Sequence, residues 1–306
     1  MLQPKALQKG DEITIVSTAR KITKEELVPA IAIFENWRLE VKLGKNLFAK
    51  HHQFAGTQEQ RIEDLQAALD NPEIKAIFFA RGGYGTVQLI DSIDFSTFQN
   101  YPKWLVGYSD VTVLHNHINQ NFGVETVHGN MPISFPKVGD DESTKTIQEA
   151  LFGNPYNVDF QLEEGSLHVT NEEHCAPIVG GNLSIIYSLT GTTSQLETKG
   201  KFLFIEDLDE YLYHIDRMMI NLKRAGLFDG CVGVLVGGMS DMNDNTIPFG
   251  SNAKEVIANN LKEFKIPVIF GVPSGHIKKN LALIMNREAQ LKINEGNATL
   301  SFHGRS

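Results

Sequence analysis

The sequence predicts an α/β protein of two domains, in which the first domain holds a parallel sheet covered by helices on both faces. Three observations support this prediction. Short, uniformly apolar segments alternate with amphipathic segments of helical period along most of the chain. Between about residues 133 and 178 the alternation gives way to turn-forming and acidic residues, which is typical of a domain junction. The length of 306 residues is sufficient for two hydrophobic cores.

Strands and helices are expected to alternate in the amino-terminal half. The expected strands cover residues 12–18, 38–43, 74–80 and 103–108, and the expected helices cover residues 23–37, 57–70 and 111–122. Thr57 and Gln60 have the spacing of a capping box, which predicts that the second helix begins there. Strands this uniformly apolar are normally buried on both faces, so a parallel sheet with helices on each side is expected.

The carboxy-terminal half continues the alternation and then becomes richer in strands. After residues 180–192, strands are expected over 201–207, 231–238 and 266–272, with helices over 214–226 and 251–264. Three further strands are expected over residues 281–285, 288–293 and 298–302. We therefore expect an amino-terminal domain over residues 1–135, a linker region over 136–178 and a carboxy-terminal domain over 179–306.

The composition argues against several classes of protein. The formal net charge is −9, so nucleic acid or an acidic membrane surface would be repelled. The opening MLQPKALQKGDE has no basic start followed by an apolar core, and no apolar run approaches the length of about eighteen residues that a spanning helix needs. A cytoplasmic location is therefore expected. Cys175 and Cys231 lack CxxC spacing and are expected to be free thiols.

Polar or glycine-rich segments follow several expected strands directly. In open parallel sheets, the loops after the carboxyl ends of the strands converge on one crevice, and helix amino termini point into it. The segments at these ends are Arg81–Thr86, Ser109–Asp110, Glu206–Asp207, Met239–Asp241 and Ser274–His276. We expect reactive groups among them.

Ser109 is the candidate nucleophile. A serine on a tight turn between a strand and a helix exposes its hydroxyl above the sheet, and the next N–H points at any oxyanion formed beside it. The segment reads Gly-Tyr-Ser-Asp-Val rather than G-x-S-x-G, and the alternative is that Ser109 or Asp110 only caps the following helix. A nucleophilic serine needs a base and a group that orients the base, and His276 and Glu206 supply these two types.

Other readings remain for the base and its partner. Asp207, Asp209 and Glu210 lie in the same acidic run as Glu206, although Glu206 is the acid that directly continues the apolar strand. His276 has the alternative of a solvated loop histidine.

The glycine-rich loop ARGGYGT suits an oxyanion site better than a nucleotide site. Neither GxxxxGK[ST] nor GxGxxG can be written through it. Gly82 and Gly83 would let a substrate carbonyl approach bare backbone, although a turn that only needs positive φ is the alternative. His115 and His117 lie two residues apart on an expected helix and point to nearly opposite sides, so they cannot share one metal ion. No metal or other cofactor is expected.

Several motifs together resemble one protein family. ARGGYGT, VGYSDVTVLH, VHGNM, GGNLSIIYSLTGT, FIEDLDEYLYHIDRMM and SGH stand in the order and spacing of the LD-carboxypeptidase family of serine peptidases. This family also includes the microcin C immunity peptidases. The resemblance extends from about Gly10 to about Leu300, and several motifs in one order are more specific than any single one.

The resemblance implies a Rossmann-like amino-terminal domain that carries the nucleophile. A smaller, more β-rich α/β carboxy-terminal domain would carry the other two members of the triad. By this resemblance, Ser109 is the nucleophile, His276 is the general base and later the acid, and Glu206 orients His276. The N–H groups of Asp110 and Gly83 would form the oxyanion hole.

The resemblance also implies a substrate and an assembly. Members are commonly dimeric and metal-independent, and the best-known ones act in the cytoplasm on recycled murein tetrapeptides. They cut the bond between the L-centre of diaminopimelate and the terminal D-alanine. Such a substrate presents a free carboxylate beside the scissile bond, and Arg81 is the nearest cation in sequence to the expected oxyanion hole. The alternative for Arg81 is a structural ion pair with a neighbouring acid.

The sequence departs from the family pattern at two places. GHIKKNLALIMN stands where G-H-G-x-x-N and LPLG are usual, and Asn130 stands where proline is usual.

Two other functions are alternatives. One is a peptidase for another small acyl-peptide, such as a microcin-type peptidyl-nucleotide, which a loop with a tryptophan would favour. Neither Trp37 nor Trp104 is expected in such a loop. The other is a non-catalytic protein that binds a ligand between two lobes, which leaves the residues at the strand ends unexplained.

Overall fold

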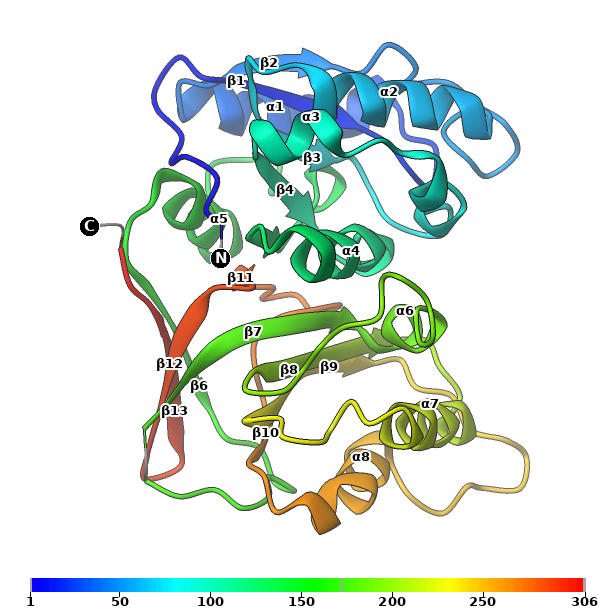
Figure 1. Cartoon of the computed structure of the whole chain (residues 1–306), viewed down its shortest axis with the longest axis vertical. Helices are drawn as coiled ribbons and strands as arrows, with labels where there is room; N and C mark the ends of the chain where they lie inside the picture. The colour runs from blue at the N-terminus through cyan, green and yellow to red at the C-terminus, as the bar shows by residue number, and fades with distance from the viewer. Residues whose placement is uncertain (1, 172, 305–306) are drawn as a thin grey trace.

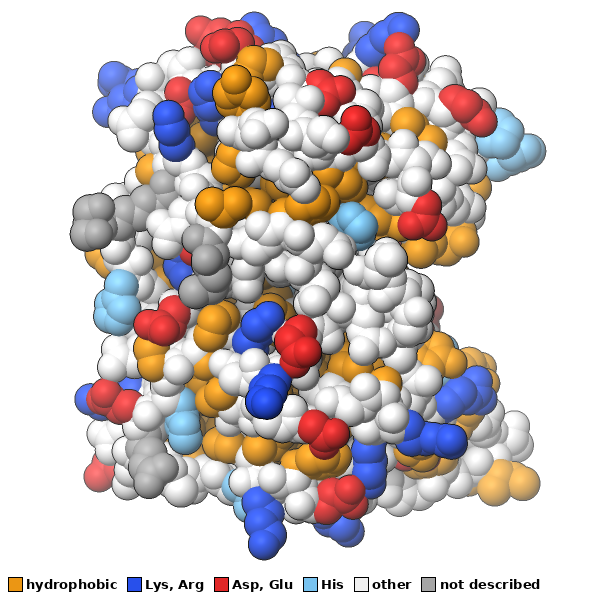
Figure 2. Space-filling view, in the orientation of Figure 1, with side chains coloured by type: hydrophobic (Ala, Val, Ile, Leu, Met, Phe, Trp, Pro, Cys, Tyr) orange, Lys and Arg blue, Asp and Glu red, His pale blue; other side chains and the backbone are white. Residues whose placement is uncertain are grey.

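The computed structural model describes residues 2–171 and 173–304 and folds them into two lobes, each built around a β-sheet (Figure 1). Residues 1, 172, 305 and 306, which fall within the expected domains and linker, lie outside the described residues. The surface is drawn in between the two lobes at the right margin of Figure 2. Both lobes combine helices with a sheet that contains parallel strands, which confirms the fold class predicted from the sequence.

The first sheet collects strands from both halves of the chain. Its strands are β1 (Glu12–Val16), β2 (Glu40–Leu43), β3 (Ile74–Phe79), β4 (Trp104–Gly107), β5 (Thr126–His128) and β11 (Leu283–Met285). Among the described residues their order across the sheet is β11-β5-β4-β3-β1-β2. β1 to β5 pair in parallel, whereas β11 runs antiparallel to β5. The carboxy-terminal half therefore extends the sheet of the first lobe.

Helices cover both faces of the first sheet. α1 (Lys24–Asn36) and α5 (Glu142–Phe152) pack on one face, and α2 (Gln58–Asp70), α3 (Ser96–Asn100) and α4 (Thr112–Phe122) pack on the other. In β3, Ala76 and Phe78 join the core on the first face, while Ile77 and Phe79 join the core on the second. Because side chains alternate along a strand, this apolar segment gives each face a surface to bury. The predicted covering of both faces is confirmed.

Local hydrogen bonds define where the helices begin. The Gln60 N–H donates to Thr57 Oγ1, and the Thr57 N–H donates to Gln60 Oε1, which confirms the predicted capping box at α2. Thr23 and Glu26 form the same motif at α1. These bonds satisfy N–H groups that have no acceptor within the helix, so each helix has a defined first turn.

The second sheet is parallel on one side and antiparallel on the other. Its strands are β6 (Tyr156–Gln161), β7 (His174–Asn182), β8 (Phe202–Leu208), β9 (Gly233–Ser240), β10 (Val268–Phe270), β12 (Glu288–Asn294) and β13 (Asn297–Phe302). In the described chain they are ordered β10-β9-β8-β7-β12-β13-β6. β7 to β10 are parallel, and β12, β13 and β6 pair antiparallel. The helices on the parallel part are α6 (Leu183–Ser188), α7 (Leu212–Arg224) and α8 (Ala253–Leu261).

The sequence does not predict several of these elements. β5 is a short strand, and β6 is an edge strand that alternates buried and exposed residues within the segment 136–178, for which the sequence predicts a linker. The sequence also places residues 281–285 in the second domain, whereas they form β11 of the first sheet. Membership of a sheet does not by itself define a domain, so the boundaries at 135 and 178 stay predictions. Short 3-10 helices make further connections: η1 (Thr86–Gln88), η2 (Ile90–Ser92), η3 (Ser109–Val111), η4 (Pro132–Ser134) and η5 (Lys262–Phe264).

The two lobes share one buried apolar cluster. Phe202 and Phe204 of the second sheet belong to the same cluster as Phe78 of the first. A buried ion pair lies in the same region, because Arg287 Nε donates to Glu125 Oε2 at 2.9 Å. Removing one partner of a buried ion pair typically costs about 3–5 kcal/mol. The relative position of the lobes is therefore held by packing and by a buried charge pair.

The described chain confirms the expected state of the cysteines. Cys231 is buried and Cys175 is exposed, and both are free thiols. Burial raises the pKa of each thiol, which disfavours the reactive thiolate.

None of the helices within residues 2–171 and 173–304 combines the length and the apolar character that a bilayer crossing needs.

The stability of the protein is expected to fall in mild acid because of His115 in α4. The ring is fully buried, and Nε2 donates to the Gly107 carbonyl at 2.9 Å. Burial lowers the pKa of His115 from 6.5 to about 4. The unfolded chain therefore binds a proton that the folded chain does not, and the stabilisation present above pH 6.5 is lost as the pH falls toward 4. This loss is expected to be about 3 kcal/mol of unfolding free energy.

Urea unfolding at about pH 7 and at about pH 4.5 measures this effect. The variant His115→Gln can still donate to the Gly107 carbonyl but cannot titrate. We expect the wild type to lose more unfolding free energy than the variant between the two pH values. An equal loss in both proteins would contradict the assignment.

Candidate active site

Ser109 lies on a strained turn between β4 and α4. It begins η3, and its φ of 62° is in the left-handed region that residues with a side chain rarely adopt. Such a conformation costs roughly 1–2 kcal/mol, and positions of this kind cluster at functional sites. The strand, turn and helix that the sequence predicts around Ser109 are all present.

The glycine loop after β3 lies against Ser109. A Cβ at Gly82 would stand 3.2 Å from Ser109 Oγ, so the bare backbone of this loop directly faces the hydroxyl. Gly83 has a φ of 121°, and a Cβ there would stand 2.6 Å from Arg20 Cγ. Among the described residues, the N–H groups of Gly83 and Asp110 donate to no acceptor. Both residues line the same cleft as Ser109.

The Asp110 side chain faces away from this chemistry. Its Oδ2 accepts from Thr86 N at 2.8 Å and from Thr86 Oγ1 at 2.6 Å. The carboxyl is buried, and burial raises its pKa despite these hydrogen bonds. Asp110 therefore ties the nucleophile turn to η1 through its side chain and leaves its N–H free.

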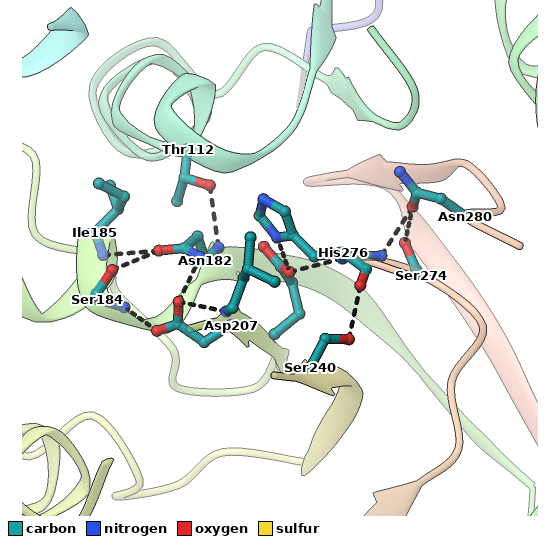
Figure 3. Close-up of polar contacts among 12 residues, drawn as sticks. Thr112, Asn182, Ser184, Ile185, Asp207, Ser240, Ser274, His276 and Asn280 are labelled. Atoms are coloured by element: carbon teal, nitrogen blue, oxygen red, sulfur yellow. Dashed lines mark hydrogen bonds and ion pairs between the residues drawn. The ribbon is translucent and has the colours of Figure 1, made fainter. Parts of the chain in front are cut away.

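Glu206 and His276 form a hydrogen-bonded pair in the second lobe. Glu206 is near the end of β8 and is 0% exposed. Its Oε2 accepts from His276 Nδ1 at 2.7 Å and from the His276 N–H at 3.1 Å. Because Nδ1 carries the proton in this pair, Nε2 of the neutral ring is the nitrogen that can accept a proton. Figure 3 shows His276 among the polar contacts of this region.

The electrostatic environment of His276 favours the protonated ring. Burial lowers the pKa of His276, but the hydrogen bond that its ring donates to Glu206 and the charges of Glu206 and Asp207 together raise it above 6.5. The Tyr108 ring packs against the imidazole, with 4.8 Å between the ring centroids. The imidazole is thus held by a carboxylate on one side and by an aromatic ring on another.

Two asparagines that the sequence does not single out hold the loop of His276. Asn280 Oδ1 accepts from the Gly275 N–H at 2.8 Å, and Asn280 Nδ2 donates to Asn130 Oδ1 at 2.9 Å. Ser240 Oγ adds a bond to the His276 carbonyl at 2.7 Å (Figure 3). Asn130 stands where proline is usual in the family pattern, but this departure does not by itself indicate a contact with Asn280. Asn130 gives the loop a further hydrogen bond.

A cleft of about 430 Å³ lies between the lobes and brings the candidate residues together. Residues from the first lobe that line it include Arg81, Gly83 and Ser109, and those from the second include Asn182, Asp207 and His276. Glu206 lies behind His276, fully buried. In the described part of the chain, no hydrogen bond joins the Ser109 hydroxyl to the His276 ring.

The walls of the cleft differ in charge. Arg20 and Arg81 line it from the first lobe, and Asp207, Asp209 and Glu210 line it from the second. Arg81 makes one long hydrogen bond, from Nη1 to the Lys21 carbonyl at 3.4 Å. The sequence does not single out Arg20. Arg20 follows β1, whereas the glycine loop that it packs against follows β3, so the two are far apart in the sequence.

The other acids of the run after β8 bind other partners. Asp207 accepts from Asn182 and from the Ser184 N–H, and its pKa is raised to about 7 by burial and by the charge of Glu206. Asp209 accepts from an asparagine, and Glu210 pairs with a histidine of α7. In the described chain, Glu206 is thus the acid of this run that contacts the His276 ring.

The cleft combines a serine on a strained strand-to-helix turn with a histidine that a buried carboxylate orients. This combination is typical of hydrolases with a nucleophilic serine. Family models agree with this class. The LD-carboxypeptidase N-terminal domain matches residues 13–129, and the LD-carboxypeptidase C-terminal domain matches residues 176–291. The chain belongs to the LD-carboxypeptidase family, and this membership indicates a carboxypeptidase, which is a hydrolase. The resemblance seen in the sequence is confirmed.

The chain is also similar to named relatives in sequence and to solved structures in fold. A probable murein peptide carboxypeptidase of Bacillus subtilis is 34% identical over 97% of this chain and 94% of its own length. The murein tetrapeptide carboxypeptidase of Pseudomonas aeruginosa is 26% identical over 92% of this chain and 93% of its own. The structure of a muramoyltetrapeptide carboxypeptidase from Oxalobacter formigenes matches with a TM-score of 0.85 and 24% identity, over 95% of this chain and 98% of that one. The microcin C7 self-immunity protein matches with a TM-score of 0.86 and 20% identity, over 100% of both chains. The two structures show that the fold is shared.

Gly275 is expected to be indispensable for the Glu206–His276 pair. Its φ is 107°, and a Cβ there would stand 2.7 Å from Glu206 Oε2. Gly275→Ala is therefore expected to displace His276 and to lower carboxypeptidase activity at least about a hundredfold. Steady-state kinetics and thermal unfolding measure both effects.

Gly191→Ala is the matched control. Gly191 has a φ of 82°, and a Cβ there would meet nothing within 4 Å. The control should lose about 1 kcal/mol from backbone strain and keep its activity. Equal activity in the two variants would contradict the role given to Gly275.

Proposed function

We propose that this protein is a serine carboxypeptidase that removes the terminal D-alanine from murein tetrapeptides in cell-wall recycling. The observation that carries the proposal is the buried Glu206–His276 pair in the cleft that Ser109 also lines. The names of the relatives in Bacillus subtilis and Pseudomonas aeruginosa support the substrate class. The bond that is cut would be the one between the L-centre of the third residue and D-alanine.

In the proposed mechanism, Ser109 Oγ attacks the scissile carbonyl while His276 Nε2 takes its proton. The N–H groups of Gly83 and Asp110 stabilise the oxyanion, and one such donor is typically worth about 3 kcal/mol of transition-state stabilisation. His276 then donates the proton to the departing amine of D-alanine as the C–N bond breaks. Water, deprotonated by His276, hydrolyses the ester on Ser109. Glu206 keeps the ring oriented and balances its positive charge.

The cationic wall of the cleft supports recognition of a carboxyl terminus. Arg81 and Arg20 line the cleft beside the glycine loop, where they could bind the carboxylate of a terminal D-alanine. Guanidinium groups suit this task because they bind carboxylates through two parallel hydrogen bonds. We therefore propose that both Arg20 and Arg81 bind the terminal carboxylate of the substrate.

The two alternatives make different predictions for an activity panel. A peptidase for peptidyl-nucleotides would benefit from a tryptophan that stacks on the base, yet Trp37 and Trp104 are both buried away from the cleft. Turnover of an aminoacyl sulfamoyl nucleoside but not of a murein tetrapeptide would favour this alternative. Binding of either compound without turnover would favour a non-catalytic ligand-binding protein. The homodimer and the cytoplasmic location also remain proposals.

Ser109→Ala is expected to fold like the wild type and to lose at least about a thousandfold in kcat/KM on a murein tetrapeptide. Release of D-alanine measures the rate, and thermal unfolding checks the fold. Ser188→Ala is the control, because Ser188 does not line the cleft and its Oγ donates to the Ile185 carbonyl within α6. Turnover retained by Ser109→Ala would end the assignment.

The rate is expected to fall in acid because His276 must be neutral to act as a base. Since Glu206 and Asp207 raise the pKa of His276, the acidic limb of kcat/KM should have its midpoint above 6.5. Asp207, with a pKa of about 7, titrates in the same range, so the limb should persist in Asp207→Asn, in which His276 still titrates and residue 207 does not. Glu206→Gln removes the charge and should move the midpoint to lower pH while it lowers the rate. An unchanged midpoint would argue against the pair.

A further inference from the structure

Among the described residues, several hydrogen bonds join the helix that follows the nucleophile to the second lobe, and the one between Asn182 and Thr112 is fully buried. Thr112 is the first residue of α4, and its hydroxyl accepts from the Asn182 N–H at the end of β7, at 3.0 Å (Figure 3). Thr112 is 0% exposed and Asn182 is 5% exposed. A buried N–H that loses its acceptor cannot turn to water instead, so this contact constrains both elements.

The backbone of β7 lies directly against the Thr112 side chain. Gly181 has a φ of 136°, and a Cβ there would stand 2.5 Å from Thr112 Oγ1 and 2.8 Å from Thr112 Cγ2. No residue with a side chain fits at this position unless the Thr112 side chain, α4 or β7 moves. The contact therefore fixes the distance between α4 and β7 as well as their hydrogen bond.

The hydrogen bonds continue from Asn182 toward the catalytic pair. Asn182 Nδ2 donates to Asp207 Oδ1 at 2.8 Å, and Asp207 Oδ2 accepts from the Ser184 N–H at 2.9 Å (Figure 3). Asp207 follows Glu206 on β8, and Asn182 pairs with Glu206 in the register between β7 and β8. Glu206 in turn holds His276. A short path of bonds thus connects the helix after Ser109 to the imidazole.

We propose that Thr112 is a positioning residue for hydrolysis, which holds β7, and through it Glu206 and His276, opposite Ser109. This inference rests on the proposed function, because it takes Ser109, Glu206 and His276 as the reacting groups. Thr112 is buried and cannot touch the substrate, so it acts through Asn182. Its loss should therefore change the rate of the chemical step rather than substrate binding.

The test compares Thr112→Val, which keeps the shape but removes the acceptor, with Thr112→Ser, which keeps the acceptor. We expect Thr112→Val to lower kcat about 10- to 100-fold with KM within about twofold of wild type, because misplaced catalytic groups have costs of this order. Thr112→Ser should recover kcat to within about threefold of wild type. Melting temperatures are measured for every variant.

Thr146→Val is the matched control. Thr146 Oγ1 in α5 also accepts a buried backbone N–H, from Ala282 at 3.0 Å, but lies outside the cleft. This control should lose stability and keep its kcat, which separates the loss of a buried hydrogen bond from the loss of a positioning contact.

The outcomes distinguish this inference from the proposed function. Turnover by Ser109→Ala in the same assay would overturn the proposed function itself. If Ser109→Ala is inactive and Thr112→Val turns over at the wild-type kcat, this inference alone is overturned. The same holds if Thr112→Ser is as slow as Thr112→Val. If Thr112→Val does not fold, Thr112→Ala takes its place, since it removes both the acceptor and the methyl group that packs against Gly181, and a wild-type kcat in that variant also overturns the inference.

Discussion

The hydrogen bond between Glu206 Oε2 and His276 Nδ1 is the interaction on which the site depends. Glu206 is fully buried, and among the described residues its second oxygen has no partner. A carboxylate removed from water is costly unless it is paired, so the negative charge of Glu206 draws the imidazole into one orientation. That orientation directs Nε2 away from the carboxylate. The same charge favours the protonated ring that would form during catalysis.

The lobes are held so that Ser109 and His276, with Glu206 behind it, line one cleft. β11 places a segment of the carboxy-terminal half in the first sheet, and residues of both lobes share one apolar cluster. Glu125 and Arg287 add a buried ion pair. Because these contacts cross between the halves of the chain, the packing of the core holds the two walls of the cleft together. An active site built in this way depends little on rearrangement.

Much of this arrangement is predictable from the sequence, for physical reasons that can be named. The alternation of apolar strands with amphipathic helices requires a sheet covered on both faces, and the reactive residues follow strand ends where such sheets form crevices. Ser109 and Glu206 are found in this way because each directly follows or continues an apolar strand. The sequence does not predict β6, because an edge strand is half polar. It also does not place β11 in the first sheet, because a short apolar segment carries no information about which sheet it joins. Contacts such as Asn280 with Asn130, or Arg20 with Gly83, join distant parts of the chain and have no local signal.

The most direct measurement is a crystal structure of the protein after reaction with a phosphonate that mimics the tetrahedral intermediate. The proposed site predicts phosphorus bonded to Ser109 Oγ and His276 Nε2 within about 3.2 Å of that oxygen. It also predicts a phosphonyl oxygen that accepts from Gly83 and Asp110 at about 2.7–3.1 Å. Phosphorus on another residue, or a labelled Ser109 with the His276 ring directed elsewhere, would contradict this account of the active site.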